Sequence, residues 1–276
     1  MDLKIMLSEH LVSLLIGMAL SISIAFISFR LKALTAGGGV GTAIVGTIVF
    51  ALGGMAAAVP LIIFFVTSSL LSHITPRRKI RALMLADKGK RRDIMQVFAN
   101  GGIGAICVVL HAVTGNTFWF FCFLASICEA AADTWATEIG TMAASNPVSI
   151  ISFRKIDPGM SGGITLIGTL AATAGAILVA FGSVPFIGWN RSPDDSLTGP
   201  IIASIIAGFA GSIIDSIVGA SIQARFRCPV CGKATEKDIH CNRPTVLKGG
   251  VRFINNDIVN LLGTLSAAIF VLLFLR

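Results

Sequence analysis

The sequence predicts an all-α, polytopic membrane bundle of about eight transmembrane helices, and its composition and apolar runs are the observations behind this fold class. Of the 276 residues, 54% are hydrophobic and 13% are charged, whereas soluble domains carry about 25% charged residues. The mean hydropathy is +0.85. Several apolar runs approach the roughly 20 residues that span a bilayer. The longest segment between these runs, 223–255, is shorter than an ordinary soluble domain, so residues 1–276 are expected to form a single integral membrane domain.

The expected helices are bounded by charged residues, glycines and polar turns. Their ranges are 11–29, 34–52, 55–74, 97–115, 117–140, 161–183, 199–222 and 256–275. Only Gly53 and Gly54 separate the second range from the third, so a tight helical hairpin is expected there.

Lysine and arginine are concentrated in the segments that alternate with these helices. If the N-terminus is outside, 19 of the 22 basic residues fall in cytoplasmic segments, chiefly the loops near 75–96, 141–160 and 223–255. The positive-inside rule therefore predicts that both termini are outside. The net charge of +8 follows from this topology, so it requires no nucleic-acid partner. We expect a plasma membrane of bacterial or archaeal type, with the active face toward the cytoplasm.

Three carboxylates interrupt the fifth apolar range, in CEAAADTWATEIG at 128–140. A polar stripe within about 80° of helix surface is formed by Ser126, Glu129, Asp133 and Thr137. One charged residue at the bilayer centre costs about 2.5–3.5 kcal/mol, so the stripe is expected to face the bundle interior or water. Glu138 falls on the opposite side of an ideal helix. It is expected either to face cytoplasmic water or to join the stripe if the helix unwinds near Gly140.

Two further helices carry acids toward the same side of the membrane. Asp215 lies in the seventh range, in GSIIDSIVGASIQ, and Asp257 stands at the start of the last range, in NNDIVN. Mg²⁺ prefers such oxygen ligands, together with water and substrate phosphate oxygens. The expected magnesium ligands are Asp133, Asp215, Glu129 and Asp257. For Glu129, Asp133 and Asp215 the alternative is a buried ion pair or an interhelical hydrogen bond.

Glycines stand where three helices are expected to begin at the cytoplasmic face, in TAGGGVG at 35–41, NGGIG at 100–104 and DPGMSGG at 157–163. Free amides at the positive end of a helix dipole form a phosphate site. The expected phosphate-binding residues are Asn100, Gly101, Gly102, Arg154, Lys155, Ser161, Gly162, Gly163 and Asn256. For Gly37 and Gly41 close helix packing is the favoured explanation, whereas anion binding is favoured for DPGMSGG.

Two cytoplasmic loops carry further polar residues. The basic run from Arg77 to Arg92 could close over a nucleotide, but a solvated, positive-inside loop explains most of it. A C-x2-C-x8-H-C pattern is formed by Cys228, Cys231, His240 and Cys241. Four soft ligands in a reducing compartment suit a structural Zn²⁺. Unliganded loop cysteines are the alternative, because the adjacent His240 and Cys241 are awkward ligands for a single ion.

Six ordered blocks resemble one family: AGGGVGTAIVGTIVFALGG, QVFANGG, AAADTWATEIG, PGMSGGITLIGT, GSIIDSIVGASIQ and NNDIVN. Over about residues 30–270 the chain is similar to the integral membrane family known as domain of unknown function 92, which includes the transmembrane protein 19 group and the chloroplast phytyl-phosphate kinase. The resemblance implies that an isoprenyl monophosphate is phosphorylated to its diphosphate by a nucleoside triphosphate, CTP or another.

The residue patterns fit this implied activity, because phosphoryl transfer is catalysed mainly by positioning and by charge neutralisation. The residues expected to be catalytic are Asp133, Asp215, Glu129 and Glu138. The sequence lacks the Walker A pattern, so the nucleotide would bind in another way. The competing interpretation is a transporter of a lipid phosphate or small anion, in which the acids would carry a proton or a cation.

Overall fold

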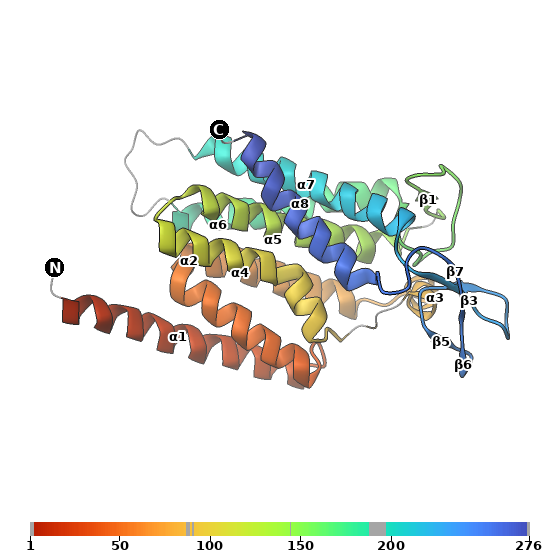
Figure 1. Cartoon of the computed structure of the whole chain (residues 1–276), viewed down its shortest axis with the longest axis horizontal. Coiled ribbons are helices and arrows are strands. Elements are labelled where there is room, and N and C mark those ends of the chain that lie inside the picture. Colours follow the sequence, from red (N-terminus) through yellow and green to blue (C-terminus); the bar gives the residue numbers. More distant parts are fainter. Residues whose placement is uncertain (1–2, 87–88, 90, 144, 188–196, 275–276) are drawn as a thin grey trace.

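The computed structural model describes residues 3–86, 89, 91–143, 145–187 and 197–274, and its long helices lie side by side in one bundle (Figure 1). The helices are α1 (Leu3–Arg30), α2 (Ala36–His73), α3 (Arg77–Leu85), α4 (Ile94–Thr114), α5 (Phe118–Gly140), α6 (Leu166–Ile187), α7 (Thr198–Ser221) and α8 (Asn256–Phe274). Six of them, α1, α2, α4, α6, α7 and α8, are long and apolar enough to cross a membrane. The predicted all-α membrane bundle is confirmed.

The long helix α2 reverses direction at Gly54, whose φ of 57° and ψ of −155° lie outside the helical region. Glycine reaches this conformation without the strain that a Cβ would add. At the end of α2, His73 Nε2 lies 3.3 Å from the carbonyl oxygen of Leu31, which is in the turn before α2. The reversal therefore brings the end of α2 back toward its start. The helical hairpin predicted at 53–54 is therefore present. When α5 is added to these six helices and the two arms of α2 are counted as two, the long helices correspond to the eight predicted segments.

The central helix of the bundle is α5, which contacts α2, α4, α6, α7 and α8. Every residue from Phe120 to Ala132 is buried. Small residues allow the neighbours to approach closely, since a Cβ added to Gly208 of α7 would lie 2.5 Å from Cys128 Cβ. This packing places Glu129, the first acid of α5, in the centre of the bundle.

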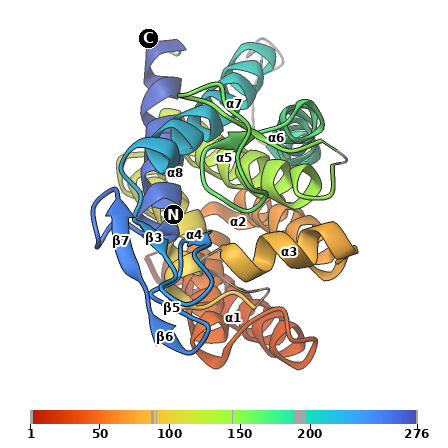
Figure 2. The same cartoon turned by 90° about the vertical axis from the view of Figure 1, so that its right-hand side faces the viewer.

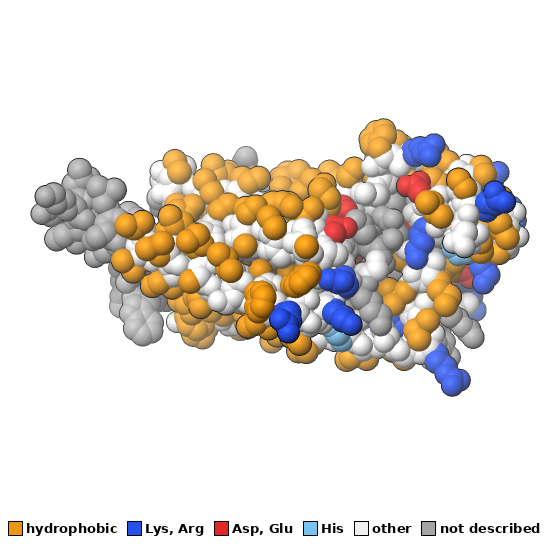
Figure 3. Space-filling model, turned by 90° about the horizontal axis from the view of Figure 1, so that it is seen from below, with side chains coloured by type: hydrophobic (Ala, Val, Ile, Leu, Met, Phe, Trp, Pro, Cys, Tyr) orange, Lys and Arg blue, Asp and Glu red, His pale blue; other side chains and the backbone are white. Residues whose placement is uncertain are grey.

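The segments predicted to be cytoplasmic lie together at one end of the bundle, which we call the basic end, and the two termini lie at the other (Figure 1). Lysine and arginine side chains gather toward the basic end, whereas apolar side chains cover the helices (Figure 3). Residues 225–249 form a small β structure there, which we call the ribbon. Figure 2 shows the ribbon beside α3, which lies across the ends of the long helices.

All strands are short and pair antiparallel at the basic end. The pair β1 (Val148–Ser149) and β2 (Gly163–Ile164) joins the two sides of the loop before α6. In the ribbon, one sheet has the order β4 (Ala234–Thr235), β3 (Arg225–Arg227), β7 (Val246–Gly249), and a separate hairpin joins β5 (Ile239–His240) to β6 (Arg243–Pro244). The ribbon and α3 replace what the sequence predicted as loops at 223–255 and 75–96.

Two predicted helix starts at the basic end are wrong. The helix α4 begins at Ile94, because Asp93 and Gln96 form a reciprocal capping box. The glycines of NGGIG consequently lie inside the helix and do not open it. The helix α6 begins at Leu166, five residues later than predicted.

The late start of α6 has a local cause in the preceding loop. Gly159 and Gly162 adopt left-handed φ values of 91° and 75°, which are incompatible with a right-handed helix. The side chain of Thr165 then accepts a hydrogen bond of 3.0 Å from the Gly168 amide, which caps the new helix. Residues 161–163 therefore belong to a loop and a strand, so no helix dipole starts at them.

Candidate functional site

A cavity of about 1020 Å³ lies at the basic end, where the helices meet α3 and the ribbon. Its polar lining includes six of the predicted site residues or groups: Asn100, Asp133, Glu138, Ser161 with Gly162 and Gly163, Asp215 and Asn256. The structure thus brings together residues from four helices and one loop that are far apart in the sequence. The volume is at the upper end of the range typical of small-molecule sites.

Two carboxyl groups face each other in this cavity. The side chains of Asp133 in α5 and Asp215 in α7 are close enough to interact with each other. The side-chain amide of Asn260 in α8 lies 3.2 Å from Asp215 Oδ2 and, on its other side, 3.3 Å from Asn100 Oδ1. Two carboxylates this close repel each other unless a proton or a cation lies between them. The pair could therefore share a proton or hold a cation.

Glu129 lies one turn deeper in α5 and is 1% exposed. Neither of its carboxylate oxygens has a hydrogen-bond partner among the described residues. Two glycines make room for this side chain, since a Cβ at Gly211 would lie 2.7 Å from Glu129 Cγ and one at Gly263 would overlap Glu129 Oε1. A buried carboxylate without partners is costly. Its unsatisfied oxygens fit the oxygen-donor chemistry that Mg²⁺ requires.

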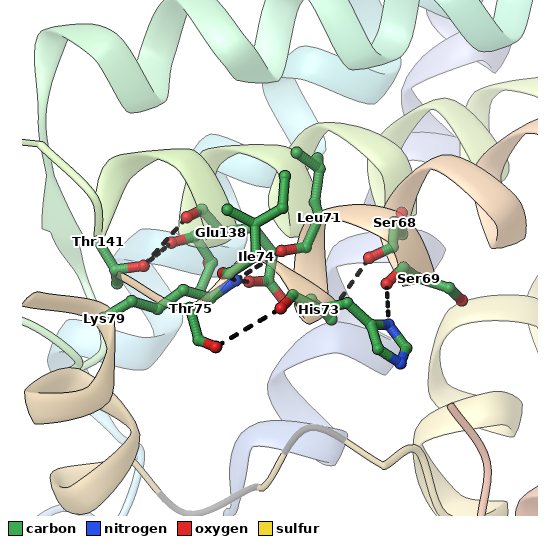
Figure 4. Close-up of polar contacts among 11 residues, drawn as sticks. Ser68, Ser69, Leu71, His73, Ile74, Thr75, Lys79, Glu138 and Thr141 are labelled. Atoms are coloured by element: carbon green, nitrogen blue, oxygen red, sulfur yellow. Dashed lines mark hydrogen bonds and ion pairs between the residues drawn. The ribbon is translucent and has the colours of Figure 1, made fainter. Parts of the chain in front are cut away.

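Glu138 is predicted either to face cytoplasmic water or to join the stripe of acids after the helix unwinds, and the structure shows neither. The helix continues to Gly140 without unwinding, yet Glu138 does not simply face water. Its carboxylate forms an ion pair with Lys79 of α3 and accepts a hydrogen bond from the Ser72 hydroxyl (Figure 4). Glu138 therefore joins α5 to α2 and α3 on the opposite side of α5 from Glu129.

Three basic side chains line the same cavity, namely Lys79, Arg92 and Lys233. The guanidinium of Arg92 lies 5.3 Å from the centre of the Phe64 ring and 5.7 Å from that of Phe65. Burial lowers the pKa of Arg92 to about 10, and the negative charge of Glu138 partly offsets this by raising it. Arg92 therefore remains protonated at neutral pH.

The prediction of a solvated loop is wrong for Lys79, which is 3% exposed, and for Arg92. Two sequence signals could have found them. In RRKIRALML, which contains Lys79, the basic and apolar residues recur with the spacing of an amphipathic helix. The D-x-x-Q pattern directly after Arg92 is the signature of a capping box, which indicates an ordered helix start there.

The loop predicted to bind phosphate already holds a carboxylate. The backbone amide of Ser161 donates to Glu236 Oε1 at 2.6 Å, and Gln223 Nε2 donates to Glu236 Oε2 at 3.0 Å. Glu236 comes from the ribbon and lines the cavity. The Ser161 amide therefore already has an anionic partner within the protein, and phosphate binding by this loop stays a prediction.

Of the other predicted residues, the possible zinc ligands Cys231, His240 and Cys241 also line the cavity, whereas Glu129 and the residues that follow lie outside its lining. Gly101 and Gly102 are inside α4, where their amides belong to the helix, and Asp257 is buried at the start of α8. Lys155 lines a second cavity of about 780 Å³ beside the ribbon, and Arg154 lines neither.

The four predicted zinc ligands come together in the ribbon. The ligand atoms of Cys228, Cys231, His240 and Cys241 all lie within 4.8 Å of one another. A hydrogen bond from the Cys231 backbone amide, with further donors, lowers the pKa of the Cys228 thiol to about 6, whereas desolvation raises the pKa of Cys241 to about 11.

Comparison with known proteins places this arrangement among membrane proteins. A family model described as integral membrane protein DUF92 matches residues 19–268. Protein PGR of Arabidopsis thaliana is 32% identical, over 91% of this chain and 92% of its own length. An uncharacterised membrane protein of Methanocaldococcus jannaschii is 26% identical over 88% of this chain and 94% of its own. Protein VTE6, chloroplastic, of Arabidopsis thaliana is 26% identical over 83% of this chain and 61% of its own. No solved structure matches the chain.

Proposed function

The chain belongs to the integral membrane protein family DUF92, and from this membership and the cavity at the basic end we propose that it is a Mg²⁺-dependent isoprenyl phosphate kinase. The reaction would convert an isoprenyl monophosphate into the diphosphate at the expense of a nucleoside triphosphate, CTP or another. The protein is a multi-pass membrane protein, and the proposed location is a plasma membrane with the basic end in the cytoplasm.

The observation that carries the proposal is a cavity with two kinds of charge on its walls. Asp133 and Asp215 provide carboxylate oxygens on the helical side, and Arg92 and Lys233 provide cations from the segments at its mouth. Phosphoryl transfer needs both, because the phosphates must be held by cations while the divalent ion is held by acids. A site built from carboxylates alone would repel a substrate phosphate.

The reaction needs little covalent chemistry from the protein. A non-bridging oxygen of the isoprenyl phosphate attacks the γ-phosphorus, and the bond from this phosphorus to the β–γ bridging oxygen breaks. The electron pair stays with the nucleoside diphosphate. The attacking phosphate is already ionised, so no general base is required, and Arg92 and Lys233 would hold the negative charge in place.

Mg²⁺ fits the donor set described above, with Asp133, Asp215 and Glu129 as the residues that would hold it. When bound, it would neutralise phosphate oxygens and orient the nucleotide. The fit rests on the close Asp133–Asp215 pair and on the unsatisfied oxygens of Glu129. Glu129 and Asp257 are both buried outside the cavity lining, so their claim is less direct than that of Asp133 and Asp215.

The bilayer would accommodate the isoprenyl tail. The long helices expose many large apolar side chains on their outer surfaces, and Figure 3 shows such side chains along one face of the bundle. An amphiphilic phosphate could therefore keep its tail in lipid while its head group enters the cavity.

The test uses purified protein in detergent with Mg²⁺, a γ-labelled nucleoside triphosphate and a panel of isoprenyl monophosphates. We expect label in the isoprenyl diphosphate with at least one donor, and loss of this label on chelation of Mg²⁺. If no donor labels any lipid while Asp133→Asn abolishes proton- or ion-coupled flux in liposomes, the transporter interpretation replaces the kinase. Flux without dependence on Asp133 would contradict both.

A further inference from the structure

We propose that Cys228, Cys231, His240 and Cys241 bind one structural Zn²⁺, which fixes the ribbon over the mouth of the cavity. The four residues come from two hairpin turns of the ribbon that face each other. Each turn supplies two ligands, as in the structural zinc sites of small β ribbons.

The distances between ligand atoms agree with a tetrahedral zinc. With zinc–sulfur bonds of about 2.3 Å and zinc–nitrogen bonds of about 2.0–2.1 Å, a sulfur and a nitrogen ligand lie about 3.5 Å apart. His240 Nδ1 lies 3.6 Å from Cys231 Sγ and 3.2 Å from Cys241 Sγ. Small shifts of side chains would therefore complete the tetrahedron.

The first turn presents Cys228 and Cys231 from the β3–β4 hairpin. The Gly232 amide donates to the Cys228 carbonyl at 3.0 Å, with Gly232 at a left-handed φ of 71°. The Cys228 sulfur lies 3.7 Å from the His240 carbonyl oxygen, so the first turn faces the second.

The second turn explains how two adjacent residues can both be ligands. Cys241 and Asn242 have φ values of 52° and 57° and form the two-residue turn between β5 and β6. This is the turn geometry that usually selects glycine or asparagine, and a cysteine held there is strained. This conformation brings the Cys241 sulfur to 3.2 Å from His240 Nδ1. Binding of one ion by both side chains would offset the cost of the strained backbone.

The ribbon is attached to the cavity next to these turns. The Thr235 hydroxyl and the Glu236 amide donate to the Leu85 carbonyl of α3 at 2.8 and 2.9 Å. Lys233 and Glu236, on either side of β4, line the cavity. A zinc ion in the ribbon would therefore fix the positions of Lys233 and Glu236 relative to the end of α3. The importance of these positions for catalysis rests on the proposed function, but the metal site itself does not.

The direct test is the metal content of the whole protein purified in detergent without chelators. We expect about one zinc per chain, and a loss of more than tenfold in Cys231→Ser and in Cys241→Ser. The matched control is Cys107→Ala in α4, which should keep the zinc. Wild-type protein that holds no zinc, or that holds iron instead, would overturn the proposal, as would a Cys231→Ser variant with wild-type zinc content.

Two measurements on the wild-type chain cover the case in which these variants fail to fold. Replacement of zinc by Co²⁺ should give the visible absorption of a tetrahedral cobalt thiolate, whereas an octahedral spectrum would contradict the site. Removal of zinc by a chelator should speed hydrogen exchange at the Glu236 amide by about tenfold or more. Unchanged exchange there would contradict the role in holding the ribbon. Neither readout requires kinase activity.

Discussion

Lys79 of α3 is a buried ammonium that ties α2, α3 and α5 together at the mouth of the cavity. Its three N–H donors meet three acceptors, the Glu138 carboxylate and the carbonyl oxygens of Leu71 and Ile74, the last two at 2.7 and 2.8 Å (Figure 4). We predict that Lys79→Met will strongly destabilise the protein, because it removes the ion-pair partner of Glu138.

The magnitude follows from the burial of the two partners. The side chains of Lys79 and Glu138 are 4% and 17% exposed. Breaking a buried ion pair by removing one partner costs about 3–5 kcal/mol. Water can reach Glu138 in part, so we take the lower end, about 3 kcal/mol, which changes the unfolding equilibrium on the order of 100-fold. The double variant Lys79→Met/Glu138→Gln removes the stranded charge and should recover about 1–2 kcal/mol.

The assay is denaturant unfolding in mixed micelles, followed by tryptophan fluorescence. Arg77→Met is the matched control, because Arg77 is exposed on the same helix and its replacement should change stability by less than about 0.5 kcal/mol. The reasoning is refuted if Lys79→Met unfolds like Arg77→Met, or if the double variant is no more stable than the single one.

Three other substitutions test separate parts of the structure. Gly263→Ala should cost about 1–3 kcal/mol and reduce phosphoryl transfer, since the new Cβ overlaps the Glu129 carboxylate. Gly54→Ala should cost about 1–3 kcal/mol from backbone strain alone, because the space around Gly54 is open. Glu236→Gln should lower the KM for the phosphate substrate by about threefold to tenfold, because a neutral amide competes less with phosphate for the loop amide and no longer repels it.

One control serves both glycine predictions. Gly39 of α2 is helical and has open space around it, so Gly39→Ala should be neutral or slightly stabilising in the same unfolding assay. Equal effects of Gly39→Ala and Gly54→Ala would show that the reversal of α2 does not depend on the glycine. A raised KM in Glu236→Gln would indicate that this carboxylate supports substrate binding and does not compete with it.

The bundle itself could be predicted from the sequence because apolar runs and their charged boundaries depend on local composition. Even the hairpin in α2 could be predicted, since two consecutive glycines are a local signal. The stripe of acids on α5 follows from helical spacing, and its burial follows from the cost of charge in lipid. These inferences need no knowledge of which helices are neighbours.

The mouth of the cavity could not be predicted in the same way, because its residues meet only in the folded chain. Glu138 depends on Lys79, which is 59 positions away, and Ser161 depends on Glu236, 75 positions away. A basic loop and an ordered basic helix also obey the positive-inside rule equally well, so charge alone could not separate Lys79 from its solvated neighbours. The strands of the ribbon are two to four residues long, too short for a periodic pattern.

The central claim is that the carboxylates of α5 and α7 serve phosphoryl transfer at the basic end. The most direct measurement compares the rate of γ-phosphate transfer to an isoprenyl monophosphate by wild type, Asp215→Asn and Asp238→Asn. Asp238 is an exposed acid of the ribbon outside the cavity lining, so its variant should keep the wild-type rate. Asp215→Asn should lose at least about 100-fold in kcat while remaining folded. Transfer at the wild-type rate by Asp215→Asn would contradict the claim.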